Sequence, residues 1–164
     1  MKILIVLFAL IVLLLGISYL VSGGQTEIIH TVQIKKTPYE VLHYIADMRN
    51  ELKWNPEAEY VEQKSDGPIE VGTVFSAKWQ RSDTIDVTVI EYYPPYWVVF
   101  KNGGPLQITR RWTLSPSGAT TKLELKWMAT PAGFTRAIFP VYRMQMKAQE
   151  KKNMLRLKQA LENN

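Results

Sequence analysis

The sequence predicts an α+β fold in which a curved antiparallel sheet of seven strands wraps a long C-terminal helix, preceded by one transmembrane helix. Three observations support it. A run of apolar residues opens the chain, segments of alternating apolar and polar residues follow between turn signals, and a long amphipathic segment closes it. We expect residues 1–24 to form the anchor with a short linker, and residues 25–164 to form one domain.

The opening run, Ile3–Val21, contains no charged residue. At about 1.5 Å per residue, such a helix nearly spans a hydrocarbon core of roughly 30 Å. A cleaved signal peptide is the alternative, but its apolar part is usually about 7–15 residues long and ends in a small-x-small site. Tyr19-Leu20-Val21 stands where small residues are needed, and Ser22-Gly23-Gly24 fits a flexible exit. We therefore expect a single-pass protein of the cell membrane, with its domain on the extracytoplasmic side.

The rest of the chain predicts one strand, two short helices, six strands and a long helix. The first short helix begins at Pro38, with Thr37 and Glu40 in a capping box, and the second lies around residues 50–54. The long helix begins or is kinked at Pro140. The strands are expected at residues 28–34, 60–63, 73–80, 84–92, 96–101, 108–114 and 122–128. A single long helix can bury its apolar side across the concave face of such a sheet.

Composition excludes several classes of site. The chain has no cysteine, so disulfides, thiolate metal sites and a cysteine nucleophile are excluded. No residues have metal-ligand spacing and no Gly-rich phosphate loop precedes a helix, so we expect neither metal nor cofactor. Residues 132–164 carry seven Lys or Arg and two acidic residues. The net charge of this segment, +5, equals that of the whole chain. This stripe is a solvated helix face or a contact for anionic lipid; without interleaved aromatic residues it does not predict nucleic-acid binding.

Several motifs resemble one family. They are Val32-Gln33-Ile34-Lys35-Lys36-Thr37-Pro38-Tyr39-Glu40-Val41, Tyr44-Ile45-Ala46-Asp47, Asn50, Trp54-Asn55-Pro56, Val71-Gly72-Thr73, residues 89–95 and residues 157–162. Their order resembles the SRPBCC superfamily of helix-grip proteins, which includes START lipid-transfer domains and birch-pollen allergens, and in particular its polyketide cyclase/dehydrase-like branch. The resemblance covers roughly residues 25–164. It implies a helix-grip fold in which Asp47, Trp54 and Pro56 shape the helix pair.

Polar candidates for the site come from the inward-facing positions. Alternation places Arg110 on the same face as Ile108 and Trp112, and His30 on the face of its own strand that points inward. On the closing helix, Glu150 and Asn153 fall on the apolar side, with Tyr142 at its edge. Arg110 and Glu150 form an ion pair that holds the helix on the sheet, or Arg110 binds a ligand carboxylate or phosphate.

Large apolar side chains complete the predicted pocket. The candidates are Phe75, Trp79, Phe100 (or Trp97 in its place), Trp112, Trp127 and Met146. Such residues line an apolar cavity or simply fill the core, and a bent sheet with one helix leaves a gap unless they fill it.

The resulting hypothesis is a membrane-tethered domain that binds a small hydrophobic or lipid-like ligand, without catalysis. Its expected partners are that ligand and the lipid bilayer. Two alternatives stay open: a cyclase- or dehydratase-type enzyme that uses Arg110, Glu150, Tyr142 or His30 as acid or base, and a membrane scaffold that binds no ligand and serves a membrane partner. Members of the resembled family bind lipids, hormones or polyketides, and some catalyse cyclisation or dehydration, so the fold alone does not choose.

Overall fold

The structure is a computed structural model that describes residues 2–21, 26–80, 82–104, 106–133 and 135–163. Its elements follow the predicted order, after one N-terminal helix. They are α1 (Lys2–Val21), β1 (Thr26–Ile34), α2 (Pro38–Ala46), the 3-10 helix η1 (Met48–Asn50), α3 (Glu51–Trp54), β2 (Ala58–Gln63), β3 (Val74–Trp79), β4 (Ile85–Tyr93), β5 (Trp97–Asn102), β6 (Ile108–Ser117), β7 (Thr120–Ala129) and α4 (Thr135–Glu162).

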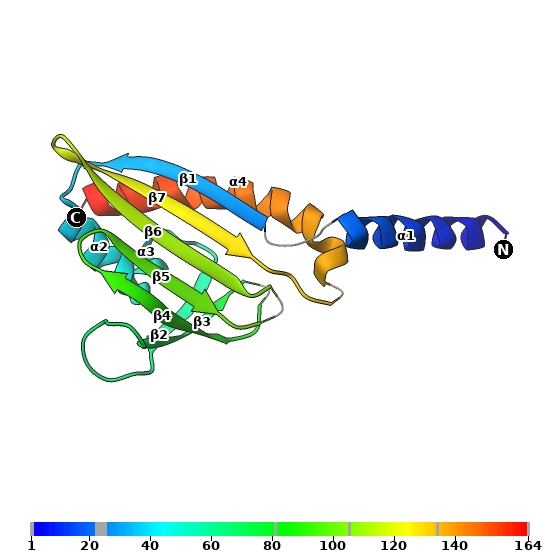
Figure 1. The fold of residues 1–164 in the computed structure, drawn as a ribbon, viewed down its shortest axis with the longest axis horizontal. Coiled ribbons are helices and arrows are strands. Elements are labelled where there is room, and N and C mark those ends of the chain that lie inside the picture. The colour runs from blue at the N-terminus through cyan, green and yellow to red at the C-terminus, as the bar shows by residue number, and fades with distance from the viewer. Residues whose placement is uncertain (1, 22–25, 81, 105, 134, 164) are drawn as a thin grey trace.

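The seven strands form one antiparallel sheet in the order β1-β7-β6-β5-β4-β3-β2. The sheet curls around α4, as Figure 1 shows, and the predicted α+β architecture of sheet and closing helix is confirmed. Register puts the side chains of Arg110, Phe100 and Trp127 opposite one another on β6, β5 and β7, on the concave face. The sheet thus presents one continuous inner surface to the helix.

The helices between β1 and β2 are fixed by local capping. Thr37 accepts a hydrogen bond from the Glu40 backbone N–H, and the Glu40 side chain accepts one from the Thr37 backbone, so the predicted capping box is present. Asp47 then ends α2 and caps η1, with its carboxylate accepting from the Arg49 backbone N–H at 3.0 Å. This abrupt change of direction points α3, and with it Glu51, back towards the sheet.

The interior contains two apolar clusters at different levels along α4. The larger one gathers residues of all seven strands, of α2 and of the C-terminal half of α4, which contributes Met154, Leu157 and Leu161. The smaller one comprises Ile28, Trp127, Ala129 and Phe139, with Leu106, Ile108 and Met146 packed against it. The two halves of α4 therefore pack against different parts of the sheet.

The closing helix begins earlier than its proline suggests. Helix α4 starts at Thr135, and Pro140 lies inside it rather than at its start. A proline inside a helix removes one backbone hydrogen bond and crowds the carbonyl four residues before it, so a helix continues past it only where packing offsets that cost. Here Ala137 and Phe139, on the N-terminal side of Pro140, are both buried.

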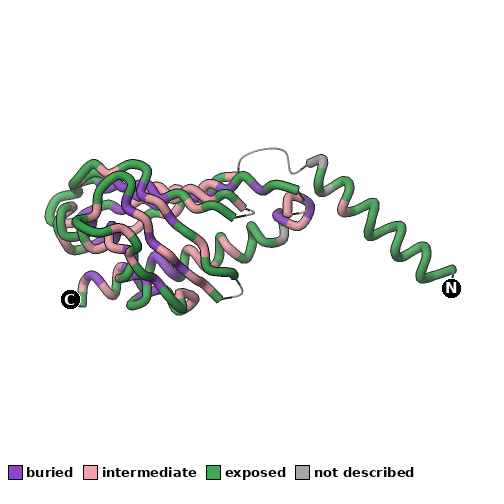
Figure 2. Tube along the Cα trace, turned by 90° about the horizontal axis from the view of Figure 1, so that it is seen from below, coloured by how far each residue is buried: buried purple, intermediate pink, exposed green. Residues whose placement is uncertain are grey.

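The predicted transmembrane anchor is corrected by the structure. Among the described residues, no helix is both long and apolar enough to cross a membrane. Helix α1 projects from the domain with exposed residues (Figure 2). The single-pass topology, the cell-membrane location and the extracytoplasmic domain that depended on the anchor are withdrawn with it, and the predicted exit at residues 22–24 lies outside the described residues.

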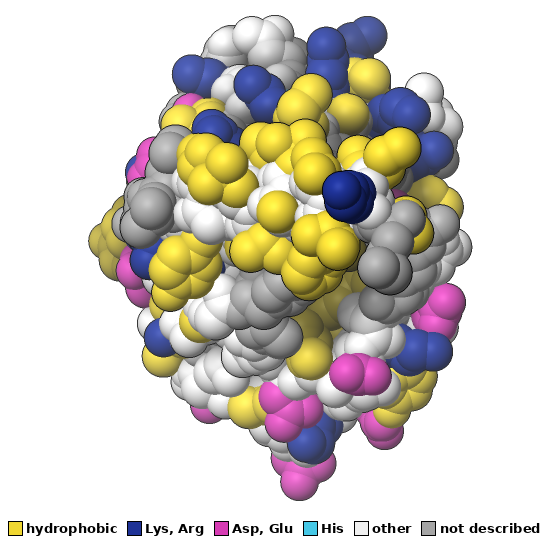
Figure 3. Space-filling view, turned by 90° about the vertical axis from the view of Figure 1, so that its right-hand side faces the viewer, with side chains coloured by type: hydrophobic (Ala, Val, Ile, Leu, Met, Phe, Trp, Pro, Cys, Tyr) yellow, Lys and Arg dark blue, Asp and Glu magenta, His cyan; other side chains and the backbone are white. Residues whose placement is uncertain are grey.

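Charges are distributed unevenly over the molecule. Figure 3 looks at the end from which α1 projects and shows Lys and Arg side chains gathered towards the top, with Asp and Glu below. Apolar side chains occupy the centre of this view. The basic residues of α4 contribute to this asymmetry, because residues 132–164 account for the net charge of the chain.

Candidate functional site

A layer of polar side chains separates the two apolar clusters. We define this polar layer as His30 on β1, Glu51 on α3, Arg110 on β6 and Glu150 on α4. Arg110 lies between Ile108, which packs on the smaller cluster, and Trp112, which belongs to the larger one. Charged groups in such a place require partners, because burying an isolated charge is costly.

Glu51 is the partner of Arg110. Its Oε1 lies 3.2 Å from Arg110 Nη1, and the two side chains are only 5% and 13% exposed. The same oxygen accepts from Asn55 Nδ2 at 2.8 Å and from Trp79 Nε1 at 3.1 Å. The guanidinium also lies over the Trp79 ring, 5.4 Å from its centre. Burial alone would lower the pKa of Arg110, but the charges of Glu51 and Glu150 outweigh that effect and raise it, so Arg110 stays charged.

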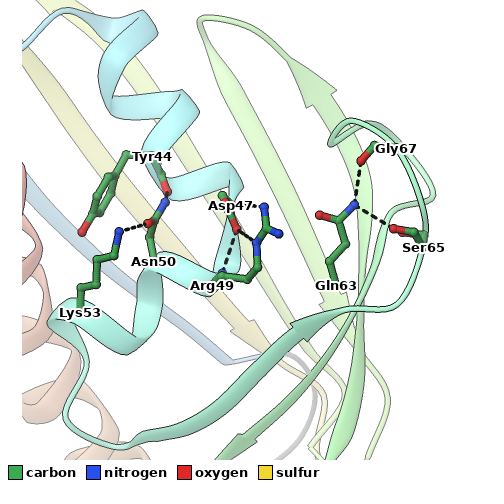
Figure 4. A network of polar contacts seen from close by, with 8 residues as sticks. All are labelled: Tyr44, Asp47, Arg49, Asn50, Lys53, Gln63, Ser65 and Gly67. Atoms are coloured by element: carbon green, nitrogen blue, oxygen red, sulfur yellow. Dashed lines mark hydrogen bonds and ion pairs between the residues drawn. The ribbon is translucent and has the colours of Figure 1, made fainter.

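The turn that carries Glu51 is held by its own polar network (Figure 4). Asn50 Nδ2 donates to the Tyr44 backbone carbonyl at 2.9 Å, and Lys53 Nζ donates to Asn50 Oδ1 at 2.8 Å. Arg49 makes two further side-chain hydrogen bonds to Asp47, each 2.8 Å long. These contacts connect α2, η1 and α3, and so fix the position from which Glu51 reaches Arg110.

Glu150 faces the same region from α4. Within the described part of the chain, its side chain has no hydrogen bond or ion pair, although it lies near Arg110. Burial raises the pKa of Glu150 to about 7; the charge of Arg110 lowers it, and the charges of Glu51 and Glu57 raise it further. The side chain is nevertheless partly exposed, so it is reachable from outside. A carboxyl group in this state can gain or lose a proton near neutral pH.

His30 occupies the β1 side of the layer, beneath α4. Burial is the largest effect and lowers the pKa of His30; a hydrogen bond with the Lys147 backbone opposes this, and the charges of Lys147 and Lys151 lower the pKa further. Its Nε2 atom is buried and has no hydrogen-bond partner among the described residues. Burial thus favours the neutral form of His30, and because the other ring nitrogen donates to the Lys147 backbone, Nε2 is left as an acceptor.

The enclosed space beside Arg110 is small. The cavity measures about 10 Å³, close to the size of one water molecule, and its lining includes Tyr44, Glu51 and Phe100. The Tyr44 hydroxyl is buried without a partner in the described part of the chain. A larger hollow of about 680 Å³ lies elsewhere, between β4, β5 and the Gly103-Gly104 turn, and has no part of the polar layer in its lining. Large side chains thus fill most of the gap that the sequence suggested.

The other predicted site residues are distributed between core and surface. Phe75, Phe100 and Trp112 are buried in the larger cluster, and Trp79 packs on it. Trp127 belongs to the smaller cluster, with Met146 against it. Asn153 is buried, but its Oδ1 accepts from Gln149 and Arg156 within the same helix. Tyr142 is 51% exposed and lies outside the polar layer.

Two residues of this region were not predicted as part of the site. Glu51 and Asn55 are both buried. Asn55 directly follows α3 and lies about one helical turn from Glu51, on the side of the helix that carries Trp54. The signal was present in the sequence, since positions three and four residues apart share a helix face. A four-residue helix offers too little periodicity for that face to be distinguished from the exposed one.

Comparison with known protein families identifies the family to which this fold belongs. A family model described as polyketide cyclase/dehydrase and lipid transport matches residues 25–162. The chain belongs to this family. The predicted resemblance to the cyclase-like branch is thereby confirmed for the domain. A comparison with curated protein sequences found no match.

Solved structures with the family fold are similar over most of the chain. The KanY protein superposes with a TM-score of 0.68 at 22% identity, covering 85% of this chain and 99% of its own. Ara h 8.0201 superposes with a TM-score of 0.65 at 12% identity, covering 86% of this chain and 100% of its own. The di-domain ARO/CYC StfQ from the steffimycin biosynthetic pathway gives 0.69 at 15% identity, covering 85% of this chain and 51% of its own. Identities this low establish the fold and leave the activity to the residues of the site.

Proposed function

We propose that this domain binds a small, mostly apolar molecule between the concave face of the sheet and α4, without catalysing a reaction. The polar layer carries the proposal, because Arg110, Glu51 and Glu150 place charged groups between two apolar clusters. Binding sites for small molecules combine apolar walls with a few placed polar groups that orient the ligand. A domain that only needed a stable core would gain little from charges in this position.

Binding requires the site to open. The cavity beside Arg110 accommodates about one water molecule, so a ligand must displace side chains or part of α4. In the N-terminal half of α4, Phe139 belongs to the smaller cluster and Met146 packs against it, whereas Met154, Leu157 and Leu161 fix the C-terminal half in the larger one. We therefore expect the ligand to enter beside Met146 and Glu150, where the helix is held less firmly.

Tryptophan fluorescence tests the proposal. All five tryptophans, residues 54, 79, 97, 112 and 127, lie in the domain and none lies in α1, so the signal reports on the domain even if α1 also attracts apolar molecules. Titration of the full chain with 1-decanol should change the emission in a saturable way. Trp127→Phe should remove much of the change, because Trp127 belongs to the smaller cluster. Trp97→Phe, which alters the opposite face of the sheet, should leave it intact. No saturable change, or equal loss in both variants, would refute binding in the interior.

A second candidate is a cyclase- or dehydratase-type enzyme, favoured by the pKa of about 7 at Glu150 beside the Arg110 guanidinium. An acid or base with a pKa near the working pH is effective in proton transfer. In a dehydration, the Glu150 carboxylate would take the α-proton of a β-hydroxy ketone and return it to the departing hydroxyl, so that the C–O bond breaks as the C=C bond forms and water leaves. The test is the conversion of a β-hydroxy ketone to the enone and water. Turnover that is lost in Glu150→Gln and follows an ionisation near pH 7 would support catalysis; no turnover above background would exclude it for this substrate class.

A further inference from the structure

Glu51 already occupies both terminal nitrogens of the Arg110 guanidinium. Its Nη1 lies 3.2 and 3.5 Å from the two carboxylate oxygens of Glu51, and its Nη2 lies 3.5 Å from Oε2. One face of its guanidinium covers the Trp79 ring. An anionic ligand would have to displace Glu51 from this pair, although Asn55 and Trp79 also hold that carboxylate in place. Arg110 is therefore a poor anchor for a ligand carboxylate or phosphate.

Among the groups that act on Glu150, negative charge exceeds positive charge; the exposed Lys147 and Lys151 of α4 act instead on His30, on the β1 side of the polar layer. Arg110 is balanced by Glu51, and the additional carboxyl groups of Glu57 and Glu150 remain. Glu57 and Glu51 act on Glu150 as like charges and disfavour its ionised form. Among the described residues, Glu150 has no hydrogen-bond or ion-pair partner and is partly exposed. A ligand group that donates a hydrogen bond to Glu150 would therefore satisfy the hydrogen-bonding capacity of this carboxyl group.

We propose that the site selects, among small apolar molecules, those that carry a hydrogen-bond donor, a protonated amine above all, and that it discriminates against carboxylates. This inference rests on the proposed binding function and specifies its ligand class. A protonated amine gives Glu150 a charge-assisted hydrogen bond and balances the excess of carboxylates. A carboxylate of the same chain length meets the like charges of Glu51, Glu57 and Glu150, while the terminal nitrogens of Arg110 are held by Glu51. The expectation that Arg110 binds an acidic ligand is thereby reversed.

Three ligands with the same ten-carbon chain test this: decylamine, 1-decanol and decanoate, each titrated into the full chain below its aggregation concentration. At pH 8 we expect decylamine to bind about tenfold more tightly than decanoate, with decanol between them. Glu150→Gln should weaken decylamine binding about tenfold and change decanol binding far less, because the glutamine oxygen still accepts from a hydroxyl but carries no charge. Glu70→Gln, in an exposed loop, is the matched control and should change neither.

The wild-type protein offers a test that needs no variant. Lowering the pH from 8 to 6 protonates Glu150, whereas decylamine stays charged, so decylamine affinity should fall and decanol affinity should not. The inference would be overturned if decanoate bound as tightly as decylamine. It would also be overturned if the affinity for decylamine changed neither with pH nor in Glu150→Gln. Binding of decanol without any preference for the amine would overturn this inference alone. Failure of all three ligands to bind would overturn the proposed function as well.

Discussion

Removal of the Arg110 guanidinium should destabilise the domain strongly. In Arg110→Met, the Glu51 carboxylate stays buried without its ion-pair partner, since only 5% of that side chain is exposed. Breaking a buried pair from one side costs about 3–5 kcal/mol. Asn55 and Trp79 still donate to Glu51, so we expect the lower end, about 3 kcal/mol. For a domain of this size, that corresponds to a fall in Tm of roughly 6–12 °C.

The neighbouring residue provides the control. Arg111 pairs with Glu91 at 2.9 Å on the same strand, but these side chains are 34% and 46% exposed. Solvent screening limits such a pair to about 1 kcal/mol or less, so Arg111→Met should cost far less than Arg110→Met. Adding Glu51→Gln to Arg110→Met removes the uncompensated charge and should recover much of the loss.

Urea unfolding of the wild type, the two single variants and the double variant measures these differences. The reasoning is refuted if Arg110→Met costs no more than Arg111→Met, because the pair would then be screened by solvent. It is also refuted if Glu51→Gln recovers nothing, because Arg110 would then stabilise the domain through other contacts.

Three further outcomes are expected. Glu150 has a pKa of about 7 in the folded chain, against 4.5 ordinarily, so the folded state binds more protons than the unfolded state between these two pH values. The free energy of unfolding should therefore fall as the pH rises from 4.5 to 7. In Glu150→Gln this pH dependence should be weaker, which urea midpoints measured across that range would show. Trp54→Ala should cost about 3–5 kcal/mol, because the buried ring packs edge-on against Trp112, and an unchanged thermal midpoint would contradict its burial. Thr37→Ala should cost about 1 kcal/mol by removing the N-cap of α2, measurable by denaturant unfolding, whereas no loss would mean that Glu40 alone maintains the cap.

The sheet could be predicted because alternation is a local property. Residues 122–128 alternate between apolar and charged, and β7 buries Leu123, Leu125 and Trp127. The start of α2 could be predicted equally well, since a capping box lies within four consecutive residues. The start of α4 was not, because burial around Phe139, a tertiary effect, overrides the break that Pro140 predicts.

The site was predictable only in part, for the same physical reason. Strand alternation was sufficient to place Arg110 on the concave face, where it lies. Its partner depends on how three helices pack over the sheet, so Glu150 was expected where Glu51 is found. The size of the cavity depends on the summed volume of many side chains, which no local pattern contains.

The division of the interior by the polar layer has a consequence for the backbone of α4. Its C-terminal half carries Met154, Leu157 and Leu161 into the larger cluster, while its N-terminal half is held by Phe139 and Met146 at the smaller one. Amide hydrogen exchange should therefore be graded along a single continuous helix, slow beyond Asn153 and fast before it, because local opening of the first half leaves the larger cluster intact. One helix would then combine two foldons, a fixed segment that holds the domain together and a segment that can detach while the domain remains folded.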